Sequence, residues 1–175
     1  MSHILLHTCC APCASASAER LLQEGYKVTL FFSNSNIFPG EEFEKRRKYV
    51  YMLAEMYNIP VIDDDYDHKA WLNTVKGLEK EPEKGKRCPV CFDFSFFRTS
   101  EKAKELNIPH FTTTLTISPH KNSRVIQEIG SNYDNYLHLD FKKQDGFKRS
   151  TELSRKFGLY RQDYCGCEFS IVQPG

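Results

Sequence analysis

Short apolar runs alternate with longer amphipathic segments along most of this 175-residue chain. Five runs have the β-branched and aromatic content of buried strands, and they span residues 3–8, 26–32, 59–65, 108–115 and 136–141. Between and after them, apolar residues recur at helical spacing in segments that span 11–25, 41–58, 66–75, 88–107, 118–130 and 146–157. The pattern therefore predicts strands and helices in alternation.

This alternation predicts an α/β fold, with a single three-layer, doubly wound, mostly parallel sheet and helices on both faces. The length and the 40% hydrophobic content favour one domain over residues 1–175. In such sheets, function lies at the carboxyl ends of the strands. We expect four loops to converge there on one crevice, at residues 8–13, 34–39, 63–67 and 112–119.

Net charge and targeting signals indicate where the protein acts in the cell more clearly than what it does. A formal net charge of +1 provides no global field that steers nucleic acid, so any RNA contact must come from local basic patches. The first residues lack the basic and apolar regions of a secretion signal, and no run approaches eighteen apolar residues. We expect a cytoplasmic protein without a membrane partner.

Seven cysteines form three groups with the spacings CCxxC, CxxC and CxC: Cys9, Cys10 and Cys13; Cys88 and Cys91; Cys165 and Cys167. An odd number without a secretion signal argues against a disulfide framework. Paired thiolates can close on one soft metal centre. A strand end followed by a helix start suits an iron–sulfur cluster, because backbone N–H groups there can hydrogen-bond to its sulfides. Zinc binding and thiol–disulfide chemistry are the alternatives.

The tight spacing of Cys165 and Cys167 has a consequence of its own. A disulfide between them would be strained, and strained disulfides reopen readily. This spacing favours a redox-active disulfide or a metal-ligand role, and two independent ligands or two inert thiols are the alternative interpretation.

Five motifs occur in order from residue 5 to residue 170: "LLHTCCAPC", "GLEKEPEKGKRCPVCFD", "FTTTLTISPHKN", "HLDFK" and "GLYRQDYCGCEFS". In these motifs the chain resembles the epoxyqueuosine reductase family commonly called QueH, the type that does not use cobalamin. The resemblance implies an oxidoreductase of queuosine biosynthesis. It would act on tRNA that carries epoxyqueuosine at the wobble position and reduce the epoxide to the alkene of queuosine.

The same resemblance implies a 4Fe–4S cluster, allows a second, mononuclear iron, and calls for an external electron donor of the ferredoxin or flavodoxin type. It also implies a fold related to the HUP class of nucleotide-binding α/β domains. Here "TCCAPCASAS" occupies the loop that usually holds a glycine-rich pyrophosphate motif, so we expect no use of ATP.

Carried over residue by residue, the resemblance places the cluster ligands at Cys9, Cys10, Cys88 and Cys91. Cys13 is a further candidate ligand. The candidates for a second metal site, a redox pair or catalysis are Asp93, Cys165 and Cys167.

Removal of an epoxide oxygen needs two electrons and stabilisation of the departing alkoxide, which an open metal position can supply as a Lewis acid. Asp93 follows Cys91 by two residues and suits such a metal better than Asp64 and Asp67, which we interpret as a solvated strand end. A proton donor is also needed. The candidates by position are His7, His120, Asp93 and Tyr164, although a histidine in an apolar strand, such as His7, is typically a structural group.

The segment 136–163 holds seven Lys and Arg residues against four Asp and Glu residues. Such an excess can follow phosphates while an aromatic side chain stacks an unpaired base, and the family resemblance, not the charge, favours this use. The candidates for stacking are Phe141, Phe147, Tyr160 and Tyr164. A solvated amphipathic helix has the same composition.

The "FTTTLTISPHKN" motif can present hydroxyls and free N–H groups to a substrate. Alternatively, its threonines fill a strand and Ser118 caps the next helix. Together with the basic segment, it provides the predicted substrate contacts: Thr113, Thr114, Ser118, His120, Arg161 and Tyr164.

Two rival functions fit many of the same residues. A zinc-stabilised RNA-binding module without catalysis would be colourless, whereas an iron–sulfur protein is brown. An ATP-using tRNA-modifying enzyme of the same fold would bind nucleotide, and the missing glycine-rich loop counts against it.

Overall fold

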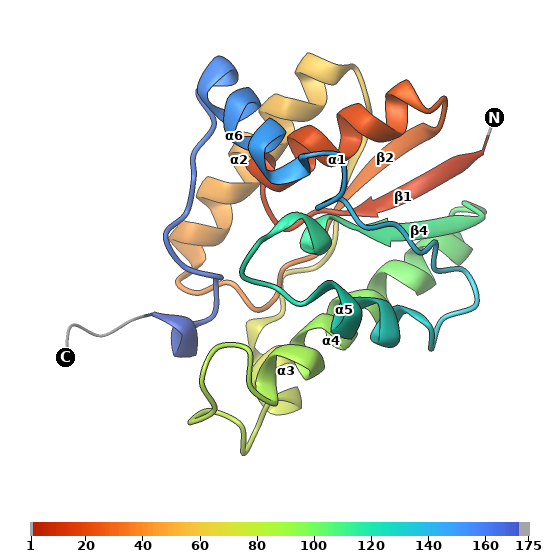
Figure 1. The fold of residues 1–175 in the computed structure, drawn as a ribbon. Helices are drawn as coiled ribbons and strands as arrows, with labels where there is room; N and C mark the ends of the chain where they lie inside the picture. Colours follow the sequence, from red (N-terminus) through yellow and green to blue (C-terminus); the bar gives the residue numbers. More distant parts are fainter. Residues whose placement is uncertain (1, 172–175) are drawn as a thin grey trace.

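The computed structural model describes residues 2–171 and contains a four-stranded, all-parallel sheet with helices on both faces (Figure 1). The strands are β1 (His3–His7), β2 (Lys27–Phe32), β3 (Val61–Asp63) and β4 (His110–Thr113), in the order β3-β2-β1-β4. The predicted α/β class with a doubly wound parallel sheet is therefore confirmed. Strands β2 and β3 lie on one side of β1, and β4 lies on its other side. The topological switch point is therefore between β1 and β4.

The helices divide between the two faces because alternate residues of each strand point to opposite sides. Ile4 and Leu6 pack with one set of helices, and Leu5 packs with the other. The first set is α1 (Ala11–Gln23), α2 (Gly40–Tyr57) and α6 (Gly146–Phe157); the second is α4 (Arg87–Glu105) and α5 (Ser123–Gly130), with α3 (His68–Thr74) against α4. Within residues 2–171, no helix has the length and apolar character needed to cross a membrane.

Two local predictions are wrong. The segment 136–141 is not a strand: Tyr136 forms a single bridge with Phe111, and Phe141 then turns into the core beneath α1. The helix expected from residue 118 begins at Ser123, and Asn122 caps it by accepting from the N–H groups of its first turn. Ser118 does not cap that helix, because the chain first forms the short 3-10 helix η1 (Thr114–Ile117) after β4.

The segment after α6 returns along α2 toward the carboxyl ends of the strands and finishes in the 3-10 helix η2 (Glu168–Ser170), drawn in blue in Figure 1. Arg46 of α2 holds this segment in place, because its guanidinium donates to the carbonyl oxygens of Cys165 and Tyr164 at 2.8 and 3.0 Å. The CxC pair from the end of the chain is thereby brought to the same edge of the sheet as the cysteines from its start.

Candidate active site

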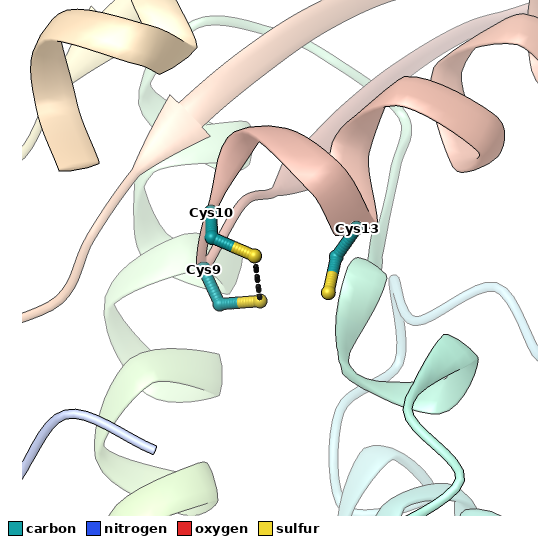
Figure 2. Close-up of side chains that lie close together, drawn as sticks. All are labelled: Cys9, Cys10 and Cys13. Carbon is teal, nitrogen blue, oxygen red and sulfur yellow. Dashed lines mark hydrogen bonds between the residues drawn. The ribbon is translucent and has the colours of Figure 1, made fainter. Parts of the chain in front are cut away.

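Three thiols meet where β1 passes into α1. Cys9 and Cys10 follow β1, and Cys13 lies in the first turn of α1. Their sulfur atoms all lie within 4.8 Å of one another, and the Sγ atoms of Cys9 and Cys10 are 3.8 Å apart. Figure 2 shows the three sulfurs gathered below the first turn of α1. We call this group the cysteine triad; its soft donors suit a metal ion or an iron–sulfur cluster.

Neighbouring loops hold the turn that carries the triad. The side-chain amide of Asn34 donates to the Thr8 carbonyl at 2.8 Å, and the Cys9 N–H donates to Thr114 Oγ1 at 3.3 Å. Cys10 is the N-cap of α1 and makes no side-chain cap hydrogen bond, so its sulfur remains available to a ligand. The triad is therefore positioned by the backbone and by groups that follow β2 and β4.

Cys10 is the most acidic of the three thiols. Hydrogen bonds from the Cys13 and Cys9 thiols, and a weaker contribution from the Gln162 amide, hold the pKa of Cys10 well below that of an ordinary thiol. The same bonds raise the pKa values of Cys9 and Cys13, because each of these thiols donates toward Cys10. Metal binding at the triad would require the thiols to give up their protons, and Cys10 would do so most readily.

A pocket with a volume of 480 Å³ opens beside the triad. Its walls come from the loops after β1, β2 and β4, from the first half of α4, from the start of α6 and from the C-terminal segment that Arg46 holds. Three of the four predicted loops therefore contribute. The fourth loop, 63–67, lies outside the pocket because β3 is an edge strand, two positions away from β1.

The remaining cysteines divide between the pocket and its surroundings. Cys91 and Cys165 line the pocket. The Cys88 sulfur accepts the Lys84 N–H at 3.3 Å, and Cys167 is buried in a cluster with Trp71 of α3 and Val75, which follows that helix. Burial, reinforced by the nearby Cys165 sulfur, raises the pKa of Cys91. All seven cysteines are free thiols, including the CxC pair.

This arrangement differs from the expected ligand set of Cys9, Cys10, Cys88 and Cys91. The sulfur that completes the compact group with Cys9 and Cys10 is Cys13, because it lies on the same first turn of α1. Cys88 and Cys91 come from the start of α4, and only Cys91 is among the pocket residues.

The predicted substrate-binding residues fall into two classes. Four of them line the pocket: Ser118, His120, Arg161 and Tyr164. Thr113 and Thr114 are fully buried, and their hydroxyls contact His7 and Cys9 at 2.9 and 3.3 Å. These two threonines contact the residues on either side of the turn that carries the triad, and their role as substrate contacts stays a prediction.

The acidic candidates lie outside the pocket. Asp93 is exposed on α4 and accepts the Tyr133 hydroxyl at 2.6 Å, so its side chain faces away from the triad. Asp64 pairs with Arg98 at 2.9 Å, and Asp67 caps α3. The predicted roles of Asp93 as a catalytic residue and metal ligand stay predictions, and the interpretation of Asp64 and Asp67 as strand-end groups agrees with their contacts.

Among the pocket residues that were not predicted, two carry polar groups that bear on the chemistry of the thiols. Lys121 lies in the turn between η1 and α5 and lines the pocket; burial alone would lower its pKa, but the nearby Cys165 and Cys9 sulfurs raise it and so favour the charged ammonium. Gln162 lies between two predicted residues on the C-terminal segment, and its side-chain oxygen is buried. Their place in the "SPHKN" and "YRQDY" motifs was the available signal.

Comparisons with known proteins agree with the resemblance of the motifs. Residues 4–173 match the family model "Epoxyqueuosine reductase QueH". A curated protein of that name from Acinetobacter baylyi is 41% identical over 174 residues, which cover 96% of this chain and 80% of the relative. Relatives of the same name from Streptococcus pyogenes and Thermotoga maritima are 39% and 33% identical and cover 98% and 99% of this chain, and 71% and 92% of their own lengths.

A solved structure supports the fold. A predicted subunit of tRNA methyltransferase from Methanocaldococcus jannaschii superimposes with a TM-score of 0.58 at 13% identity, covering 89% of this chain and 76% of that chain. At this identity the similarity concerns the fold alone.

Proposed function

Because this chain belongs to the epoxyqueuosine reductase QueH family, we propose that it reduces the epoxide of epoxyqueuosine in tRNA to the alkene of queuosine. The observation that supports this function best is the cysteine triad at the wall of a 480 Å³ pocket. The pocket lies at the topological switch point, where α/β sheets bind their ligands.

The donor set fits a 4Fe–4S cluster. Cys9, Cys10 and Cys13 would supply three thiolates, and Cys91, which lines the same pocket, would supply the fourth. When bound, such a cluster would pass electrons one at a time from an external donor of the ferredoxin or flavodoxin type to the substrate. The sulfurs that remain for a second, mononuclear iron or a redox pair are those of Cys88, Cys165 and Cys167.

The reaction breaks both C–O bonds of the epoxide, consumes two electrons and two protons, and releases water. The Lys121 ammonium would stabilise the negative charge that develops on the departing oxygen, because it faces the triad from inside the pocket. His120 is exposed at the same wall and would pass protons in from solvent. His7 does not suit this role, since its two ring nitrogens are engaged with Thr113 and the Ser33 carbonyl.

The RNA would approach over the start of α6. Phe147 is 41% exposed and lines the pocket, and the Arg161 guanidinium lies 5.6 Å from the centre of its ring. This pair would stack an unpaired base and contact a phosphate. Phe141 is buried, and the Tyr160 hydroxyl donates to Glu42, so these two aromatic residues are poorly suited to stacking.

The test is anaerobic reconstitution with iron and sulfide, followed by incubation of the reduced protein with tRNA that carries epoxyqueuosine. Mass spectrometry of the nucleosides should show iron-dependent loss of one oxygen atom. A colourless zinc protein that binds tRNA and leaves the nucleoside unchanged would overturn the proposal.

Two single variants test the ligand set. Cys13→Ala should lower the iron and sulfide content per chain and the visible absorbance, whereas Cys88→Ala should retain both. The opposite result would favour the ligand set that the motifs predict over the one that the geometry favours.

A further inference from the structure

One buried polar atom in the pocket has no partner. The Oε1 atom of Gln162 is inaccessible to solvent and accepts no hydrogen bond within residues 2–171, while the side chain lines the pocket. Buried polar groups are almost always hydrogen-bonded, so an unpaired acceptor at a ligand site calls for a partner that arrives with the ligand.

The nitrogen and the oxygen of the Gln162 amide have different surroundings. The Gln162 amide lies beside the Cys10 sulfur, since it is among the hydrogen-bonding groups that lower the pKa of that thiol. A sulfur that is ionised or bound to a metal can accept a hydrogen bond but cannot donate one, so the nitrogen must face it and the oxygen must face away. Arg46 fixes the backbone on the C-terminal side of Gln162 through the carbonyls of Tyr164 and Cys165. The acceptor is therefore held in place beside the triad.

We infer that Gln162 positions the substrate: its Oε1 atom accepts a hydrogen bond from an O–H or N–H group of the modified side chain on the tRNA base. An epoxide oxygen has no proton to donate, so Gln162 would read the group that carries the epoxide and not the epoxide oxygen. Because the other end of the amide contacts Cys10, this bond would fix the epoxide relative to the triad. The inference rests on the proposed function.

The test compares the binding of two RNAs that differ only at the wobble base. One anticodon stem–loop carries epoxyqueuosine and the other carries unmodified guanosine, and fluorescence anisotropy gives both dissociation constants for the reconstituted protein. The wild type should prefer the modified RNA. Gln162→Met keeps the length of the side chain and removes the acceptor, and it should reduce this preference by about threefold to tenfold, the loss typical of one hydrogen bond. Its affinity for the unmodified RNA should not change.

Two further variants separate positioning from a structural role. Gln162→Glu keeps an acceptor oxygen and loses the donor toward Cys10, so the preference for the modified RNA should remain. Gln23→Met changes an exposed glutamine at the far end of α1 and should leave both affinities at the wild-type values. Circular dichroism and the iron content per chain verify that each variant is folded and loaded.

The outcomes distinguish this inference from the proposed function. If Gln162→Met keeps the full preference, or weakens both RNAs equally, the inference is wrong and the reductase function stands. If the wild type neither prefers the modified RNA nor reduces it, the proposed function fails first.

Discussion

Replacement of Arg46 should strongly lower the free energy of unfolding, although this side chain does not belong to the triad. Its side chain is 1% exposed, and its Nε–H donates to the Glu42 carboxylate, which is 11% exposed, at 2.9 Å. Its two terminal nitrogens donate to the carbonyls of Cys165 and Tyr164. Arg46→Met therefore removes a buried ion pair and the two hydrogen bonds that hold the CxC segment against α2.

The cost can be worked out from these contacts. Removal of one partner of a buried ion pair costs about 3–5 kcal/mol, because the other charge is left without compensation. Glu42 keeps the Tyr160 hydroxyl at 2.8 Å, so we expect a value near the lower end, about 3 kcal/mol. Since domains of this kind have a free energy of unfolding of about 5–15 kcal/mol, this is a large fraction of the total.

Urea unfolding followed by circular dichroism measures the loss, and mass spectrometry of iodoacetamide-treated protein measures the exposure of Cys165. Arg46→Met should lower the unfolding midpoint and speed the alkylation of Cys165. Arg149→Met is the matched control: its ion pair with Glu19 is 44% and 24% exposed at the two side chains, and such pairs contribute about 1 kcal/mol or less. Equal losses in the two variants, with unchanged alkylation of Cys165, would refute the reasoning.

Three further changes have defined outcomes. Phe147→Ala should weaken tRNA binding about tenfold through lost stacking, whereas Phe97→Ala, which removes a 57% exposed side chain outside the pocket, should not alter the dissociation constant. Lys121→Met should slow single-turnover reduction by about 10²–10³ without a change in tRNA affinity, and Lys121→Arg should restore part of the rate. Burial alone would raise the pKa of Asp63, but hydrogen bonds from Arg47 lower it. This pair should therefore stabilise the fold above about pH 4 and lose that effect as the pH falls through the folded-state pKa; because both side chains are about one-third exposed, Arg47→Met should cost about 0.5–1 kcal/mol in urea unfolding at pH 7 and nothing at pH 2.

Most of the fold follows from the sequence because the strands of a parallel sheet are buried on both faces and read as continuous apolar runs. The segment 136–141 has the same apolar content but pairs with β4 only at Tyr136 and Phe111, since β4 ends at Thr113 and Phe141 is buried in the core with residues of α1. A local pattern of apolar residues predicts that a segment is buried, but it does not predict which segment pairs with it. The same limit explains Ser118, which resembles a helix cap in sequence although Asn122 caps α5.

The cysteine grouping could be predicted only in part. Cys10 and Cys13 have the same CxxC spacing as Cys88 and Cys91, so spacing treats the two pairs as equivalent. Which sulfurs meet Cys9 depends on the geometry of a single turn. There the N-cap and first turn of α1 place Cys10 and Cys13 beside Cys9, whereas the start of α4 contributes Cys91 to the pocket but no member of the compact group.

The roles of the individual polar residues were the part of the site that the sequence predicted least well. Thr114 belongs to a motif that looks suited to substrate, yet its hydroxyl accepts the Cys9 N–H and contacts the Cys9 sulfur. Gln162 lies within the "YRQDY" motif without a predicted role, yet its amide helps to lower the pKa of Cys10, more than 100 positions away in the chain. Each contact joins residues more than 100 positions apart, so its existence depends on the completed sheet and on Arg46. Metal binding at the triad and the stability of the C-terminal segment should therefore be coupled, because the groups that orient the sulfurs are the same groups that hold the two ends of the chain together.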